Sequence, residues 1–137
     1  METPKSKVEL LSPDGLHKNP AFSQLAIVDG PARTIYIGGQ NAVDKDGNII
    51  GKGDMEAQAR QVLQNLQTAL AAGNATIANI VKWNVYVIKG QQLDKAFQVF
   101  QSAMKDMKAP PLITMAFVDA LGNPDYLMEI DAIAIVP

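Results

Sequence analysis

The chain has 137 residues, of which 47% are hydrophobic and 19% charged, and its net charge is −2 at neutral pH. This size and composition fit one soluble domain, residues 1–137, with a core of its own. The slight acidity gives no general attraction to nucleic acid or to anionic membranes. The lack of cysteine excludes disulfides and thiol catalysis, and a single histidine, His17, excludes histidine-based zinc clusters and triads.

The start of the chain, METPKSKVEL, is polar and lacks the apolar segment of a signal peptide. No apolar run reaches the roughly 18 residues that a membrane span requires. We therefore expect a cytoplasmic protein that binds neither membranes nor nucleic acid.

Short strands are predicted in the first third of the chain. Prolines and glycines break residues 1–20 into an arm with one short strand at residues 8–11. Residues 22–28 (FSQLAIV) and 33–38 (RTIYIG) are both strand-like, and Asp29-Gly30-Pro31 makes a turn between them. We interpret this pair as an early hairpin.

Two helices are the clearest predictions. From Met55 to Leu70 apolar residues recur at helical spacing, Asp54 supplies an N-cap, and Gly73 closes the C-terminus. A second apolar stripe spans residues 93–107 and stops before two prolines.

Three further strands are predicted at residues 80–88, 113–118 and 126–136. The resulting order, β-β-β-α-β-α-β-β, predicts an α+β fold in which a mixed sheet carries both helices on one face. Two helices cannot hide every apolar strand row, which leaves an apolar face for burial against other subunits. The rows in question are Trp83, Val85 and Val87, and Leu127, Ile133 and Ile135.

The last strand, YLMEIDAIAIV, contains two acids, Glu129 and Asp131, whose side chains share a face because they are two residues apart. Three roles are open to them: general acid/base catalysis, structural pairing, or simple exposure. Gly38-Gly39-Gln40 likewise allows either close approach of a ligand to the backbone or a bulge. Asp44 and Asp46 lack the other ligands of a calcium loop and indicate a turn.

Four segments together resemble the Rid (YjgF) family in order and spacing. They are YIGGQNAVDKDGNIIGKGD from Tyr36, QARQVLQNLQTALAAGNATIANIVKWNVYVI from Gln58, PPLITM from Pro110, and YLMEIDAIAIV from Tyr126. The resemblance implies a chorismate-mutase-like fold. It also implies a homotrimer whose sheets face a central barrel-like core, with small-molecule clefts between subunits.

Active members of the family hydrolyse reactive enamines and imines, such as 2-aminoacrylate and 2-iminobutanoate, to 2-keto acids and ammonia. The resemblance implies that neither a metal nor an organic cofactor takes part. Some members carry an older label as translation-inhibiting endoribonucleases. The acidic composition of this chain argues against that activity.

By this resemblance, Glu129 is the cleft carboxylate that holds or activates water, and Gly39 is the backbone donor. Gly38 stands where serine is usual before Gly-Gln40, and Phe22 takes the place of the aromatic residue that lines the cleft.

The family's catalytic arginine follows a proline by two residues, before serine or threonine, and the matching pair here is Ile113 and Thr114. Phe97 stands where the deaminases have an asparagine early in the second helix.

Isoleucine cannot replace the charged, two-pronged hydrogen bonding by which arginine holds a carboxylate. We therefore expect an arginine-lacking subgroup that binds a less anionic metabolite and hydrolyses 2-iminobutanoate slowly or not at all. Two hypotheses follow from the resemblance: hydrolysis of an imine, enamine or related C–N bond at Glu129, or a non-catalytic ligand-binding or regulatory protein.

Overall fold

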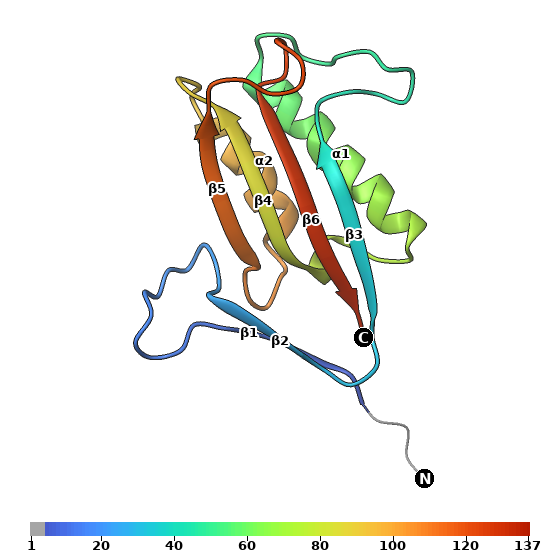
Figure 1. Cartoon of the computed structure of the whole chain (residues 1–137), viewed down its shortest axis with the longest axis vertical. Helices are drawn as coiled ribbons and strands as arrows, with labels where there is room; N and C mark the ends of the chain where they lie inside the picture. The colour runs from blue at the N-terminus through green and yellow to red at the C-terminus, as the bar shows by residue number, and fades with distance from the viewer. Residues whose placement is uncertain (1–4) are drawn as a thin grey trace.

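The computed structural model describes residues 5–137; residues 1–4, which begin the expected arm, lie outside the described residues. A four-stranded sheet in the order β3-β6-β4-β5 forms the body of the fold, and a separate pair, β1-β2, lies beyond one end of it (Figure 1). Strands β4 and β5 run parallel, and the other neighbours run antiparallel. The strands are β1 (Lys7–Leu11), β2 (Leu25–Asp29), β3 (Arg33–Gln40), β4 (Ile80–Ile88), β5 (Leu112–Val118) and β6 (Met128–Val136).

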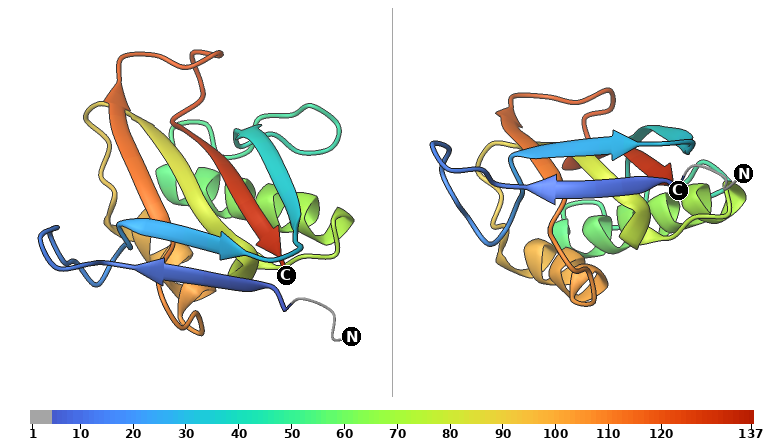
Figure 2. Two further views of the ribbon diagram at one scale, coloured as in Figure 1. Left: turned by 60° about the horizontal axis from the view of Figure 1, so that its bottom comes forward. Right: turned by 90° about the horizontal axis from the view of Figure 1, so that it is seen from below.

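Both helices, α1 (Met55–Ala72) and α2 (Asp94–Met104), lie on one side of this sheet (Figure 2), and a short 3₁₀ turn, η1 (Ile77–Asn79), leads into β4. This arrangement confirms the predicted α+β fold. The Asp54 carboxylate caps α1 by accepting a hydrogen bond from the Ala57 amide at 3.1 Å. None of the helices within residues 5–137 is long and apolar enough to cross a membrane.

The predicted early hairpin is wrong. Strand β2 pairs with β1, placing Asp29 opposite Lys7, whereas β3 pairs with β6. The alternating apolar side chains of β3 are buried beside this distant partner. Ile35, for example, lies opposite Ala134 in the layer that α1 covers. A turn signal alone could not distinguish a local partner from one about 100 residues away.

The prediction for the two apolar rows needs correction in part: Ile133 and Ile135 share a face with the two acids, as expected, but the β4 row does not lie on an uncovered face. Trp83 and Val87 are buried in the core on the helix side, together with alternate residues of β6 from Met128 to Ala134. The open face, which is the side of the four-stranded sheet away from α1 and α2, instead carries Glu129, Asp131 and their β3 and β4 neighbours. This face mixes polar and apolar side chains and includes Tyr36, which is 78% exposed.

The loop between β3 and α1 contains the turn that the sequence predicts. The Asp44 carboxylate accepts hydrogen bonds from the backbone amides of Asn48 and Asp46, both at 2.9 Å. These amides, that of Asn48 most strongly, lower the pKa of Asp44 below its usual value because they favour the charged form. Within residues 5–137, no group of three or more acidic or histidine side chains is placed to hold a metal.

Candidate functional site on the open face

Glu129 packs directly against the backbone of Gly39. A Cβ added at Gly39 would lie 2.6 Å from Glu129 Oε2 and 2.8 Å from its Cδ, closer than atoms can approach. The pairing of β3 with β6 shifts register between Ile37 and Gln40, and this irregularity brings the glycine beneath the carboxylate. Gly39 therefore lies at the β-bulge, which was one of its two predicted roles, and in close contact with the Glu129 side chain.

The residues on either side of Gly39 have simpler surroundings. A Cβ on Gly38 would meet nothing within 4 Å. The Gln40 side-chain amide donates to the Gly38 carbonyl at 3.1 Å, so it folds back over its own strand. Gly39 is thus the member of the three that a larger side chain would most disturb.

The two acids of β6 differ in their partners. Asn84, directly opposite on β4, donates its side-chain amide to Asp131 Oδ1 at 2.6 Å. Asp131 therefore has a structural partner, which the sequence alone did not reveal. Among residues 5–137, neither a hydrogen bond from a side chain nor an ion pair occupies the Glu129 carboxylate. Glu129 remains available to a ligand or to water.

Neither arginine of the chain reaches this carboxylate. Arg33 donates to the carbonyl of Gly73 at 2.7 Å, and Arg60 pairs with Glu56 at 3.0 Å on α1. A single chain therefore offers no guanidinium with which to hold a substrate carboxylate beside Glu129.

Two amide side chains of α1, Gln58 and Asn65, hold the segments that carry Gly39 and Glu129. They are seven residues apart, which places them about two turns apart along the helix. Gln58 is fully buried; it donates to the carbonyls of Gly51 and Asp125 and accepts from the Leu127 amide, at 2.9 to 3.1 Å. Asn65 donates to the carbonyls of Asn41 and Val43, just after β3. These residues were recognised in the sequence as part of a family pattern, but their positioning role appears only in the structure.

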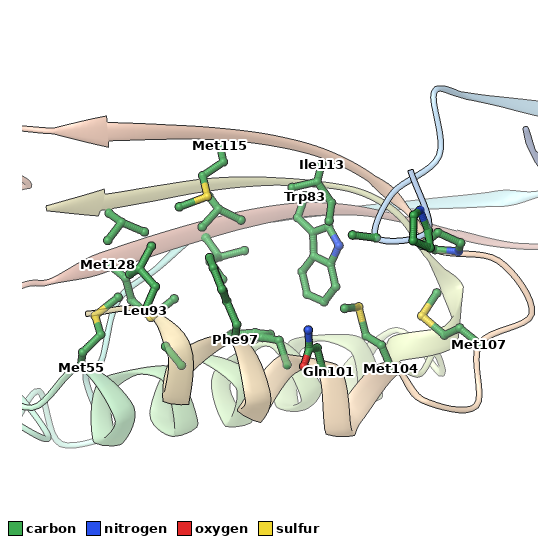
Figure 3. A pocket seen from close by; sticks show the side chains of 18 residues that line it. Met55, Trp83, Leu93, Phe97, Gln101, Met104, Met107, Ile113, Met115 and Met128 are labelled. Atoms are coloured by element: carbon green, nitrogen blue, oxygen red, sulfur yellow. The ribbon is translucent and has the colours of Figure 1, made fainter. Parts of the chain in front are cut away.

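The remaining predicted site residues divide between the two sides of the sheet. Thr114 lies beside Asn84 in the parallel β4–β5 register, on the open face. Ile113 lies beside Trp83 and points to the helix side, as does Phe97 of α2 (Figure 3). Within a single chain, Ile113 and Phe97 therefore lie on the opposite side of the sheet from Glu129.

Phe22 precedes β2 and is half-buried. Its neighbour Ser23 donates its hydroxyl to the Pro110 carbonyl at 2.6 Å and its amide to the Pro111 carbonyl at 3.1 Å. These bonds fix the loop that carries Phe22 against the start of β5.

Ile113 and Phe97 both line a cavity of about 580 Å³ between α2 and the sheet. Several methionine and phenylalanine residues of α2 border this cavity, and two of them, Phe100 and Met104, also pack against the core. Helix α2 packs on α1, and an edge-to-face contact between Phe100 and Trp83, with ring centres 5.8 Å apart, connects α2 to the sheet.

The Trp83 side chain is buried, and its Nε1–H has no acceptor within residues 5–137. Leaving such a donor unpaired costs about 1–3 kcal/mol.

Comparison with known proteins assigns this chain to a family. The model of the family described as Endoribonuclease L-PSP matches residues 16–136. A RutC family protein from Pyrococcus horikoshii is 32% identical over 100 residues, covering 73% of this chain and 77% of the relative.

Solved structures of related proteins have the same fold. The Rid-family protein YyfB from Yersinia pestis superposes with a TM-score of 0.79 at 29% identity, covering 94% of this chain and 98% of that one. TdcF from E. coli, solved with bound serine, has a TM-score of 0.67 at 24% identity, covering 76% and 81%. The α+β fold is therefore that of the Rid proteins, and the chain belongs to the endoribonuclease L-PSP family, in which they are found.

Proposed function

We propose that this protein hydrolyses an uncharged imine or enamine, with Glu129 activating water in a cleft that the open face forms in a homotrimer. The observation that carries the proposal is the Glu129 carboxylate, which lies over Gly39 and is free of protein partners within residues 5–137. Asp131, by contrast, is engaged by Asn84.

A carboxylate in this position can act as a general base. Glu129 takes a proton from water as the oxygen adds to the imine carbon, and the imine nitrogen becomes protonated as its C=N bond becomes single. The resulting carbinolamine then expels ammonia and leaves a carbonyl group. The balance is one water consumed for one ammonia released, so no further reactant is needed.

The charge of the open face favours a substrate without a carboxylate. TdcF was solved with serine, which bears a carboxylate. Here both arginines are engaged at other positions, and the open face carries two acids, Glu129 and Asp131, against one lysine, Lys82, which lies opposite Ile133. An anionic substrate would meet this negative charge without a compensating guanidinium.

RNA is not the substrate that the chain favours. Its net charge is −2, and its one histidine, His17, lies in the exposed loop between β1 and β2. Neither feature supports phosphate binding or acid–base cleavage of a phosphodiester.

The first test compares the wild type with Glu129→Gln on 2-iminobutanamide, an imine in which a neutral amide replaces the carboxylate. We expect the variant to lose about 10²–10⁴-fold in kcat, the usual contribution of a general base. Ammonia release measured under single-turnover conditions would report the chemical step.

Equal rates for the two proteins would contradict the catalytic role, and saturable binding without turnover would support the non-catalytic alternative instead. Sedimentation of the same preparation should give three times the chain mass of 14.7 kDa. A monomer that hydrolyses the imine would contradict the inter-subunit cleft.

A further inference from the structure

Imine hydrolysis at Glu129 calls for an acid as well as a base, because the imine nitrogen gains a proton while water adds to the carbon. The amide side chains near this carboxylate are engaged elsewhere. Asn84 donates to Asp131 at 2.6 Å, and Gln40 donates to the Gly38 carbonyl at 3.1 Å. The proton therefore has to come from another group on the open face.

Tyr86 lies directly opposite Glu129 in the antiparallel pairing of β4 with β6 (Figure 1). Side chains in this relation share a face, and their Cβ atoms are about 4.5–5.5 Å apart. Tyr86 is half-buried, and none of the hydrogen bonds within residues 5–137 uses its hydroxyl. An unengaged phenol thus lies beside an unengaged carboxylate.

Small residues flank this pair. Gly39 of β3 packs against Glu129, and Ala116 of β5 lies beside Tyr86 in the parallel register. Neither has a side chain long enough to cover the carboxylate or the phenol. A molecule that contacts Glu129 from the open face therefore also lies within reach of the Tyr86 hydroxyl.

Other proton donors of the open face lie farther along the strands. Lys82 and Tyr36 both lie opposite Ile133, on the two sides of β6. This position is four residues from Glu129, which corresponds to about 13 Å along the strand at about 3.3 Å per residue. The register therefore singles out Tyr86 as the donor nearest to Glu129.

We propose that the Tyr86 hydroxyl is the general acid of the hydrolysis proposed for Glu129; its role rests on that proposed function. Tyr86 gives its proton to the imine nitrogen while Glu129 takes one from water, which leaves a neutral carbinolamine, a phenolate and a protonated Glu129. The protonated Glu129 then gives its proton to the departing ammonia, and the phenolate takes the proton of the carbinolamine hydroxyl as the carbonyl forms. Both side chains return to their starting states, so each turnover begins with the same acid and base.

The test measures ammonia release from 2-iminobutanamide by the wild type and by Tyr86→Phe, which removes the hydroxyl and keeps the ring. We expect kcat to fall by about 10²-fold or more with little change in KM, since a general acid contributes about 10²–10⁴-fold. Tyr36→Phe and Lys82→Met are the matched controls, because each removes a more distant donor from the same face. Both should keep the kcat of the wild type.

The pH dependence of kcat separates a proton donor from a residue that only packs beside Glu129. A phenol loses its proton at alkaline pH, so kcat of the wild type should decline there, and Tyr86→Phe should show no such decline. The titratable groups that share the open face with Tyr86 are Glu129 and Asp131 of β6, Lys82 of β4 and Tyr36 of β3, whereas the β5 residues on this face are not titratable. Because Lys82 and Tyr36 also titrate at alkaline pH, the decline must persist in both control variants.

If Tyr86→Phe does not fold, 3-fluorotyrosine at position 86 takes its place. The fluorinated ring is nearly the same size and its hydroxyl is more acidic, so the alkaline decline of kcat should move to lower pH. A decline that stays in place would overturn the proposal.

Two further results would overturn it. If Glu129→Gln loses its activity while Tyr86→Phe keeps the kcat of the wild type, the proposed hydrolysis stands and Tyr86 is not its acid. If Lys82→Met or Tyr36→Phe loses kcat and Tyr86→Phe does not, the proton comes from that other side chain. A wild type that releases ammonia no faster than Glu129→Gln contradicts the base itself, and the role of Tyr86 with it.

Discussion

Replacing Gly39 by alanine is expected to displace the Glu129 carboxylate and to lower imine hydrolysis by about 10²-fold or more, the contribution of a correctly placed base. The added Cβ would lie 2.6 Å from Oε2, so one of the two groups must move. The end of a flexible side chain moves more easily than a strand backbone, and Glu129 should therefore swing away. Stability should change little for the same reason.

The matched control is Gly38→Ala. Its Cβ would meet nothing within 4 Å, and neither glycine has the positive φ that alanine avoids. The Cδ chemical shift of Glu129 and the rate of ammonia release should change in Gly39→Ala and stay as in the wild type in Gly38→Ala. Equal effects of the two substitutions would show that the contact with Glu129 is not what matters.

Replacing Gln58 by leucine is expected to lower the free energy of unfolding by about 2–5 kcal/mol. The side chain is fully buried, and its loss leaves the carbonyls of Gly51 and Asp125 and the amide of Leu127 without this partner. Because Leu127 leads directly into β6, the position of Glu129 should also become less well defined. Urea unfolding measures the first effect, and the Glu129 side-chain signal measures the second.

Gln64→Leu is the control for this substitution, since Gln64 lies exposed on the same helix. Its free energy of unfolding should remain within about 0.5 kcal/mol of the wild type. A similar loss in both variants would mean that helix propensity or surface polarity, rather than the buried hydrogen bonds, sets the stability.

The sequence predicted those parts of the fold that depend on local patterns. Strand β4 has the predicted bounds, and Asp54 and Gly73 end α1 as expected. The turn at Asp44 joins Val43 and Ile49, which form an isolated bridge. Each of these features is set by side chains within a few residues of one another.

Features that depend on distant partners were predicted less well. The pairing of β3 with β6 and the burial of Trp83 beneath α2 follow from long-range packing, which periodicity does not encode. The partner of Asp131 is Asn84, 47 residues away in the chain. The available signal in the sequence was Asn84 itself, because an asparagine within an apolar strand indicates a polar partner on a neighbouring strand.

Ile113 lies on the opposite side of the sheet from Glu129 of the same chain. The family pattern placed it at the position of the arginine, yet its side chain enters the cavity beside Trp83. The expectation of a less anionic ligand now rests instead on the positions of Arg33 and Arg60, both engaged away from the open face.

The ratio of kcat/KM for 2-iminobutanamide to that for 2-iminobutanoate tests the central claim most directly, because the two imines differ in the charge of one group. A site with Glu129 and without an arginine predicts that the neutral amide is hydrolysed faster, because the carboxylate of 2-iminobutanoate would lie near Glu129 without a guanidinium to offset the repulsion between the two negative charges. Faster hydrolysis of the carboxylate would contradict this account.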